Sequence, residues 1–326
     1  MKMNNYKLSK CVALSSLLLM PIVSHAKSIN IAFTQTLDSQ HGEAAKAFKQ
    51  ELETLSNNGF TVDLKPAGAL GGEREVVESL QLGIIEMTIS STGPLGNFDK
   101  DVYLFDFPYV FESYDHAHKV LDSHIGQDIL DGMSAHQIKG LAWGENGFRQ
   151  ITYNGKPILT PEDLKGRKIR TMENKVHIET FKALGASPVP MSWTEVFTAL
   201  QQGTIDGQEN PINLAVTSKL YEVQKEASLT QHLYSPAVIA MSQSYWDGLS
   251  KEEQEWVQTS AKKAAVVMRQ TRERLENEAF DELKEKGMEI DKVDITPFIA
   301  ATESVRNKLA KQMGFTERLT EIKAMK

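Results

Sequence analysis

The sequence has only one cysteine in 326 residues, Cys11, and no excess of positive charge. A single cysteine excludes a disulfide framework and a cysteine-based metal cluster. With 36 Lys and Arg against 43 Asp and Glu, the formal net charge is −7. A nucleic-acid-binding protein needs a basic surface, so nucleic acid is not an expected partner. The length suggests about two domains of roughly 150 residues each.

Catalytic and metal-binding motifs are also missing. The sequence contains no G-x-S-x-G, no H-E-x-x-H and no Walker loop, which mark common hydrolases, zinc proteases and nucleotide-binding enzymes. Three histidines cluster at 116, 118 and 124. On a helix they would point in different directions or lie about 12 Å apart along the axis, so they are better explained as surface residues than as metal ligands. We therefore expect no metal site.

The one long apolar run lies at the N-terminus. Three lysines precede a mostly apolar stretch from 11 to 23, and Ser24-His25-Ala26 follows it. This pattern predicts a secretory signal peptide over residues 1–26, cleaved after Ala26, because the apolar stretch is too short for a membrane span of about 20 residues. Cleavage would remove three lysines and the only cysteine and would take the net charge to −10. We expect an exported, periplasmic protein without a membrane anchor of its own.

The remaining chain alternates predicted strands and helices. The pattern favours strands over 28–34, 60–64, 84–90 and 168–172, with helices over 44–55, 73–82, 177–184 and 192–200. Strands separated by helices imply a mainly parallel α/β sheet. A second set of such elements starts near Gly147, which predicts two lobes of comparable size.

One predicted helix is much longer than the others. Ser250 and Glu253 form a capping box, and no helix breaker follows until Gly287. About 36 residues would span roughly 54 Å, which is more than the width of one lobe. The apolar positions follow no heptad, which argues against a coiled coil. We expect this helix to lie across both lobes.

Two arginines are candidate ligand-binding residues. Arg170 lies near the C-terminal end of the strand over 168–172, and in open α/β sheets ligands bind outside such strand ends. Arg149 lies at the expected junction of the lobes. Arginine can grip a carboxylate with two parallel hydrogen bonds, although a surface ion pair is the more common role. The glycine-rich stretch 68–72 lacks the residues of a phosphate-binding loop and is expected to be a plain loop.

Three segments between 160 and 236 carry a family resemblance: TPEDLKGRKIRT, FKALGASPVPMSWTEVFTALQQGTIDGQENPIN and KLYEVQKEASLTQHLYSP. They resemble the substrate-binding proteins of tripartite ATP-independent periplasmic (TRAP) transporters, of the C4-dicarboxylate-binding (DctP) type. Weaker similarity extends over the rest of the exported chain. The resemblance implies a two-lobed periplasmic binding protein of the Venus-flytrap type, with no catalysis and no cofactor. It also implies a small carboxylate ligand and delivery to TRAP membrane permease subunits. The lobes would comprise 27–147 with 236–275, and 148–235 with 276–326.

The resemblance also assigns roles to single residues. Arg170 matches the carboxylate-binding arginine, Arg149 a second arginine, Asn210 a ligand-contacting asparagine and Trp193 an aromatic cover. Glu73 matches a ligand-facing acid of the other lobe, whereas Glu209 and His232 match residues that support the main arginine from behind. Three of these have ordinary alternatives: Trp193 and His232 as core residues, Glu73 as an acid in the first turn of its helix. Further candidates for hydroxyl contacts, or else plain polar surface residues, are His41, Thr92 and Asn174.

The ligand prediction rests on a departure from the family pattern. After Arg170 the chain has Thr171-Met172-Glu173-Asn174, where the sialate-binding branch has a Pro-Asn pair. An acid at 173 would repel a second carboxylate but could accept hydrogen bonds from hydroxyls, so a hydroxylated monocarboxylate such as a uronate, aldonate or keto-sugar acid is favoured over sialic acid. A C4-dicarboxylate remains an alternative, as do a sensory role and a secreted enzyme that uses Glu73 and His232 as an acid–base pair.

Overall fold

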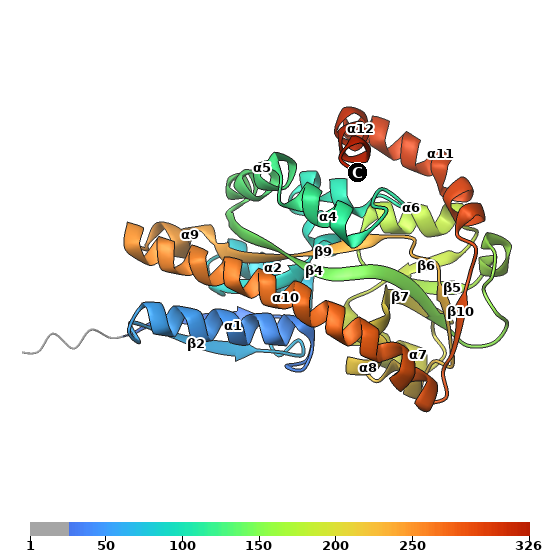
Figure 1. Cartoon of the computed structure of the whole chain (residues 1–326), viewed down its shortest axis with the longest axis horizontal. Helices are drawn as coiled ribbons and strands as arrows, with labels where there is room; N and C mark the ends of the chain where they lie inside the picture. The colour runs from blue at the N-terminus through green and yellow to red at the C-terminus, as the bar shows by residue number, and fades with distance from the viewer. Residues whose placement is uncertain (1–25) are drawn as a thin grey trace, which may run out of the picture.

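The computed structural model describes residues 26–326, and the predicted signal peptide lies, apart from Ala26, outside them. Within this range the chain is an α/β protein built on a ten-stranded sheet with the strand order β2-β1-β3-β9-β4-β7-β5-β6, and with β8 and β10 attached beside β4 (Figure 1). The strands are β1 Lys27–Ala32, β2 Phe60–Lys65, β3 Met87–Ser91, β4 Ile138–Tyr153, β5 Lys168–Thr171, β6 Ser187–Pro190, β7 Gly207–Pro211, β8 Glu226–Leu229, β9 Tyr234–Ser242 and β10 Glu289–Lys292.

Helices pack against both halves of this sheet. The α-helices are α1 Gln40–Leu55, α2 Glu73–Gln81, α3 Thr92–Leu95, α4 Tyr114–Leu121, α5 His124–Gly132, α6 Lys175–Ala183, α7 Trp193–Gln201, α8 Ile212–Thr217, α9 Gln243–Asp247, α10 Lys251–Glu285, α11 Thr296–Met313 and α12 Thr316–Ala324. Four short 3-10 helices are η1 Lys100–Asp106, η2 Met133–His136, η3 Pro161–Leu164 and η4 Leu220–Glu222.

The parallel α/β units are where the sequence predicted them. β1 pairs in parallel with β2 and β3, and β5 pairs in parallel with β6 and β7, with α1, α2, α6 and α7 in the connections. In β1, Ile29 and Ile31 are buried on either side of the half-buried Asn30, which is the period-two pattern of a strand with one face on the core. The two-lobed α/β prediction is confirmed. The residue limits proposed for the lobes stay a prediction.

A long antiparallel pair joins the two halves of the sheet. The N-terminal part of β4 pairs with β9, while its C-terminal part pairs with β7 and β8. Because one continuous strand contributes to both halves, β4 is a direct covalent link between them.

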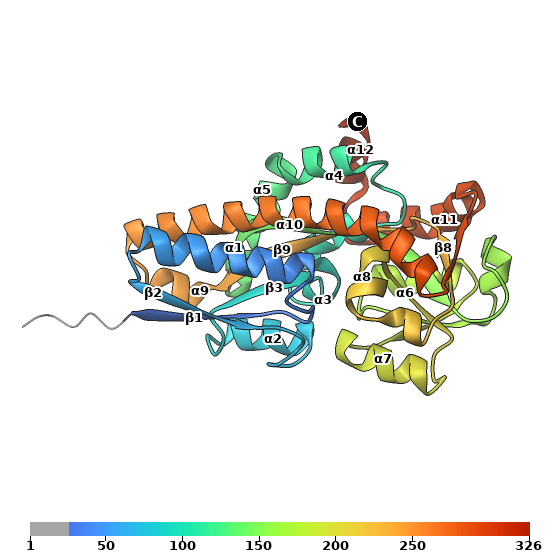
Figure 2. The same cartoon turned by 60° about the horizontal axis from the view of Figure 1, so that its bottom comes forward.

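The long helix α10 also reaches both halves. It has 35 residues, and Ser250 with Glu253 forms the predicted capping box at its start. It packs on α1 of the first half and on α8 of the second (Figures 1 and 2). Val257, Ala261 and Ala264 enter the core under α1, whereas Ala279 and Leu283 enter the core under α7 and α8. The prediction that this helix lies across both lobes is therefore confirmed.

The C-terminal helices fold back onto the first half. Leu319 and Ile322 of α12 share a core with Val120 of α4, and the carbonyl of Ile322 lies 2.8 Å from Nε2 of His116. α11 in turn packs on α6 of the second half. The pair α11–α12 thus touches both halves.

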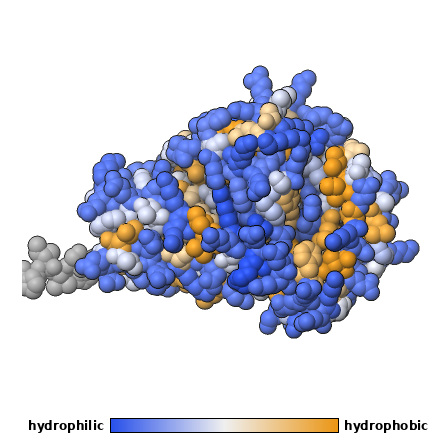
Figure 3. Space-filling model, viewed as in Figure 1, coloured by the Kyte–Doolittle hydropathy of each residue, from blue (hydrophilic) through white to orange (hydrophobic). Residues whose placement is uncertain are grey.

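The outer surface is largely hydrophilic on the face drawn in Figure 3. The most exposed large apolar side chains are Leu82 and Ile84, in the turn after α2. Within residues 26–326, no helix is both long enough and apolar enough to cross a membrane.

A glycine marks the junction within β4. The β4–β9 register shifts between Glu145 and Gly147, and Gly147 has a φ of +123°. A Cβ there would lie 3.1 Å from the hydroxyl of Tyr114. The position therefore requires glycine both for its backbone conformation and for the close approach of Tyr114.

We expect Gly147→Ala to lower the free energy of unfolding by about 1–3 kcal/mol, as typical of a side chain forced into such a backbone conformation. Urea unfolding measures this change. Gly155→Ala is the matched control, because Gly155 also has a positive φ (+101°) but no heavy atom would lie within 4 Å of the added Cβ. A larger loss at 155 than at 147 would contradict a contribution from packing at the junction.

Candidate ligand-binding site

Arg170 is buried in the second half of the sheet. It lies on β5, pairs with Gln208 of β7 and Val189 of β6, and is 2% exposed. Its Nε and Nη2 donate to the carbonyl of Met191, at 3.0 and 2.7 Å. These bonds hold the guanidinium in place and leave its Nη1 edge without a hydrogen bond to residues 26–326.

No carboxylate of the described residues lies within ion-pair distance of Arg170. Burial lowers the pKa of Arg170 to about 10, and the more distant charges of Glu209 and Glu73 oppose this effect. The group still carries its charge at neutral pH. A buried cation without a close partner is costly, so an anion placed against this arginine would lower that cost.

Arg149 is held much more tightly than Arg170. It lies on β4, and Glu209 of β7 accepts from its Nε and, at 2.8 Å, from its Nη2. Burial alone would raise the pKa of Glu209, but the Arg149 charge and the hydrogen bonds from His232 and Arg149 keep that pKa well below its usual range. Glu209 is therefore a carboxylate locked onto Arg149.

His232 completes this buried group. Its Nε2 lies 3.1 Å from Glu209 and its Nδ1 lies 2.8 Å from the hydroxyl of Thr230. Burial lowers the pKa of His232 although Glu209 favours the charged form. The family resemblance assigned Glu209 and His232 to the support of Arg170. Their hydrogen bonds go to Arg149, to each other and to Thr230, and Glu209 acts on Arg170 only through its charge.

A small cavity brings Arg170 together with residues of the first half. Its volume is about 10 Å³, room for about one water molecule. It is lined by Glu73, Arg74 and Pro94 of the first half and by Arg170, Glu173, Met191, Ser192 and Trp193 of the second. The Arg170 guanidinium carbon lies 5.7 Å from the centre of the Trp193 ring. Three of the predicted site residues therefore share one space.

Contacts between the two halves close this cavity. Arg74 lies 3.7 Å from Glu173, whose carbonyl also accepts a 2.6 Å hydrogen bond from Asn97. A Cβ on Gly72 would lie 2.3 Å from the hydroxyl oxygen of Ser192. The loop 68–72 of the first half therefore contacts the start of α7 in the second half. A sugar-sized ligand requires these contacts to open.

Glu73 has a structural bond as well as a place in the cavity. Its Oε1 accepts a 2.7 Å hydrogen bond from the backbone N–H of Ser91. It also stands in the first turn of α2, so both of its proposed roles are compatible with the structure.

Thr92 and Asn174 meet at a residue that the sequence did not single out. Asp106 of η1 accepts from the Thr92 hydroxyl and from the Asn174 amide, both at 2.7 Å. Asn174 also caps α6 by accepting from the N–H of Val176 and His177. These polar groups bind one another rather than facing the small cavity. The sequence around Asp106 gives no sign of these partners, which lie 14 and 68 positions away in the chain.

Asn210 and His41 lie outside the small cavity. The Asn210 amide donates to Gln208 at 2.7 Å on β7. His41, at the start of α1, is 1% exposed, and neither ring nitrogen has a hydrogen-bond partner among the described residues. Its neighbour Gln40 accepts a 2.9 Å bond from Asn213 of α8, so this end of α1 faces the second half.

Because burial lowers the pKa of His41 from 6.5 to about 3, the folded state resists its protonation. The unfolded chain binds the proton below pH 6.5, so stability falls as pH falls from 6.5 toward 3. Between pH 7 and pH 5 we expect this histidine to account for a loss of up to about 2 kcal/mol, which His41→Gln should abolish. Urea unfolding at both pH values measures it. His124→Gln, at an exposed histidine, should leave the loss unchanged; equal curves for His41→Gln and the wild type would contradict the expectation.

Comparisons with known proteins identify the family of the chain. Residues 32–312 match the family model of bacterial extracellular solute-binding proteins, family 7 (DctP). The chain belongs to this family.

Its relatives include the 2,3-diketo-L-gulonate-binding periplasmic protein YiaO of Escherichia coli, 37% identical over 266 residues, which cover 81% of each chain. A crystal structure of a TRAP periplasmic solute-binding protein from Polaromonas sp. JS666, bound to D-erythronate, is 44% identical with a TM-score of 0.90, covering 91% of this chain and 98% of that one. The sugar-acid-binding protein DctPAm from Advenella mimigardefordensis, in complex with galactonate, is 32% identical with a TM-score of 0.89, covering 92% and 97%.

Proposed function

We propose that this family 7 protein binds a hydroxylated monocarboxylate, of the uronate, aldonate or keto-sugar acid type, between its two halves. The observation that carries the proposal is the buried Arg170, which has no carboxylate partner among residues 26–326 and lines a cavity shared by both halves. Its free edge can bind a carboxylate with two charge-assisted hydrogen bonds. Arg149 is neutralised by its ion pair with Glu209 and lies outside the small cavity, so Arg170 is the cation that the ligand carboxylate meets in this proposal.

The other groups of the cavity favour hydroxyls over a second carboxylate. Glu73 and Glu173 are both acids, and each can accept hydrogen bonds from ligand hydroxyls. Arg74 also lines the cavity and offsets part of the Glu173 charge, so the repulsion of a second carboxylate comes mainly from Glu73, and a C4-dicarboxylate is the less favoured ligand. The Trp193 ring supplies an apolar face for the C–H groups of a sugar acid.

Closure is the expected mechanism of capture. In the open form, Arg170 faces water; the ligand then bridges the halves, and closure through β4, β9 and α10 excludes water from the ion pair. Exclusion of water strengthens that pair because the local dielectric constant falls. The contacts of Glu173 with Arg74 and Asn97 join the two halves in the described structure, and they have to shift when a sugar acid occupies the site.

The geometry supports binding rather than catalysis. An enzyme would need an acid–base pair in the cavity, for which Glu73 and His232 were the candidates. Both nitrogens of His232 lie within hydrogen-bonding distance of Glu209 and Thr230 instead. We further propose that the chain is exported, begins at Lys27 after cleavage, and delivers its ligand to TRAP permease subunits.

Thermal unfolding with candidate ligands tests the proposal. D-glucuronate, D-galactonate and D-erythronate are compared with succinate, L-malate and the neutral sugar D-glucose. We expect a sugar acid at 100 times its dissociation constant to add about 2.7 kcal/mol to the free energy of unfolding. Stabilisation by the dicarboxylates alone would contradict the ligand class, and stabilisation by glucose would contradict the role of the carboxylate.

A further inference from the structure

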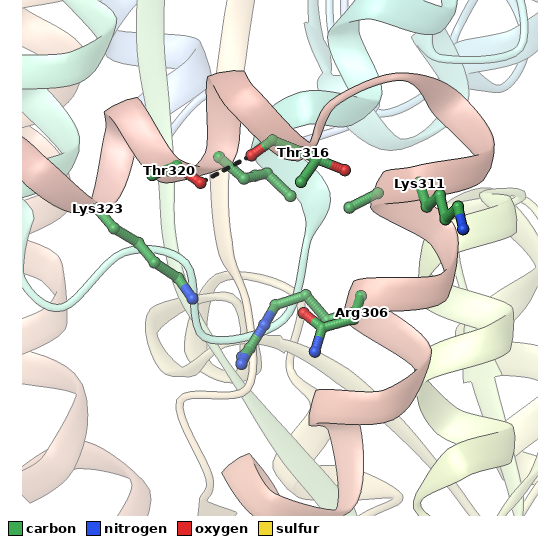
Figure 4. A pocket seen from close by; sticks show the side chains of 8 residues that line it. Arg306, Lys311, Thr316, Thr320 and Lys323 are labelled. Atoms are coloured by element: carbon green, nitrogen blue, oxygen red, sulfur yellow. Dashed lines mark hydrogen bonds between the residues drawn. The ribbon is translucent and has the colours of Figure 1, made fainter.

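A second cavity lies far from Arg170 along the chain, between the C-terminal helices α11 and α12. Its volume is about 410 Å³, enough for a small organic molecule. Figure 4 shows Arg306 of α11 and Lys323 of α12 extending into the gap between the two helices. The cavity is lined by Arg306, Asn307, Ala310, Lys311, Thr316, Leu319, Thr320 and Lys323.

The charge of this lining is one-sided. It contains three cationic side chains and no acid, although the whole chain has a net negative charge. Among residues 26–326, none of Arg306, Lys311 and Lys323 has a carboxylate within ion-pair distance. A local excess of positive charge around a concavity attracts anions.

Arg306 is the buried member of this group. It is 7% exposed, its Nη1 donates to the carbonyl of Pro108 at 3.3 Å, and its Nε has no hydrogen-bond partner among the described residues. Burial lowers its pKa, with only Glu303 acting in the opposite direction. This arginine is more than nine-tenths buried but has N–H groups without an acceptor. Binding an acceptor there would recover the free energy lost by burying them.

The rest of the lining is suited to an apolar body. Ala310 and Leu319 are both buried core residues whose side chains form part of the cavity wall. The hydroxyl of Thr320 is occupied by the carbonyl of Thr316, at 2.9 Å, so the polar contacts left at the wall come mainly from the cations.

From these observations, we propose that the cavity between α11 and α12 is a second binding site, for a small organic anion with a carboxylate and a short apolar body. The carboxylate binds Arg306 and Lys323, and the body packs on Ala310 and Leu319. Because α11 packs on α6 and α12 packs near α4, such an anion binds at helices that touch both halves of the protein.

Sodium hexanoate is the probe for this site. In NMR spectra of the exported protein, we expect it to shift the amide signals of Arg306, Thr316 and Thr320, whereas 1-hexanol, which has the same carbon chain without the charge, should not. Arg306→Gln should weaken hexanoate binding about tenfold and Lys323→Gln about threefold. If Arg306→Gln fails to fold, Lys323→Gln decides the test, because Lys323 is exposed.

Two controls separate this site from others. Lys308→Gln removes a lysine from the exposed side of α11 outside the cavity, and Arg170→Lys alters the site between the halves; neither should change hexanoate affinity here. The proposal is overturned if no amide of α11 or α12 shifts, if hexanol acts like hexanoate, or if Lys308→Gln weakens binding as much as Lys323→Gln. Inorganic phosphate that binds as tightly as hexanoate would overturn the assignment of an organic anion.

Discussion

Replacing Arg170 with lysine is expected to weaken sugar-acid binding at least tenfold, the factor that about 1.4 kcal/mol represents. Lysine keeps the positive charge but cannot form two parallel hydrogen bonds to a carboxylate. It also cannot donate twice to the Met191 carbonyl and still present a free edge, as Arg170 does. The substitution should lower ligand affinity rather than the stability of the fold, because Arg170 has no close carboxylate partner in residues 26–326 that the change would leave unpaired.

Titration calorimetry with D-glucuronate, or with whichever acid stabilises the wild type, measures this effect. Arg274→Lys is the matched control: Arg274 is exposed on α10 and, among residues 26–326, pairs only with Glu278, at 2.9 Å. It should bind the ligand like the wild type. Unchanged affinity in Arg170→Lys would remove this residue from the site and, with it, the main support for the proposed function.

The parallel units of the fold could be predicted because their patterns are local. In β1, the apolar Ile29 and Ile31 flank the polar Asn30, and the capping box Ser250–Glu253 marks the start of α10 without any knowledge of its surroundings. The antiparallel pair of β4 and β9 was not predicted. All nine residues of β9 are buried, so it shows no alternation, and Pro236 within it argues against a strand.

The site was only partly predictable for a similar reason. Position in the chain suggested Arg149 and Arg170, and the family resemblance suggested Glu209, but neither gives the strand register. Glu209 lies on β7, the strand between β4 and β5. An acid on that strand can reach toward either arginine. Only the pairing of β4 with β7 shows that Glu209 bonds Arg149 and leaves Arg170 free. Asp106 was missed because its partners Thr92 and Asn174 are distant in the chain.

The buried ion pair of Arg149 with Glu209 is the basis of the second large expected effect. Glu209→Gln should lower the free energy of unfolding by about 3–5 kcal/mol, since removing one partner of a buried ion pair leaves the other charge unpaired. Arg149 is 1% exposed, so water cannot replace the lost carboxylate without a rearrangement of the strands. His232 loses its charged acceptor in the same substitution. Urea unfolding at pH 7 measures the change, and Glu278→Gln, in the exposed pair with Arg274, should cost no more than about 1 kcal/mol.

The double variant Arg149→Gln/Glu209→Gln tests the cause. If the cost comes from an unpaired buried charge, removing both charges should be less destabilising than Glu209→Gln alone. The pH dependence gives a further check. The pKa of Glu209 is lowered by folding from 4.5, so its contribution to stability is complete above that pH and is lost as pH falls below it. The stability of Glu209→Gln should therefore decline less steeply than that of the wild type below pH 4.5. A double variant less stable than Glu209→Gln, or parallel pH curves, would show that the pair matters for its shape and hydrogen bonds rather than for its charge.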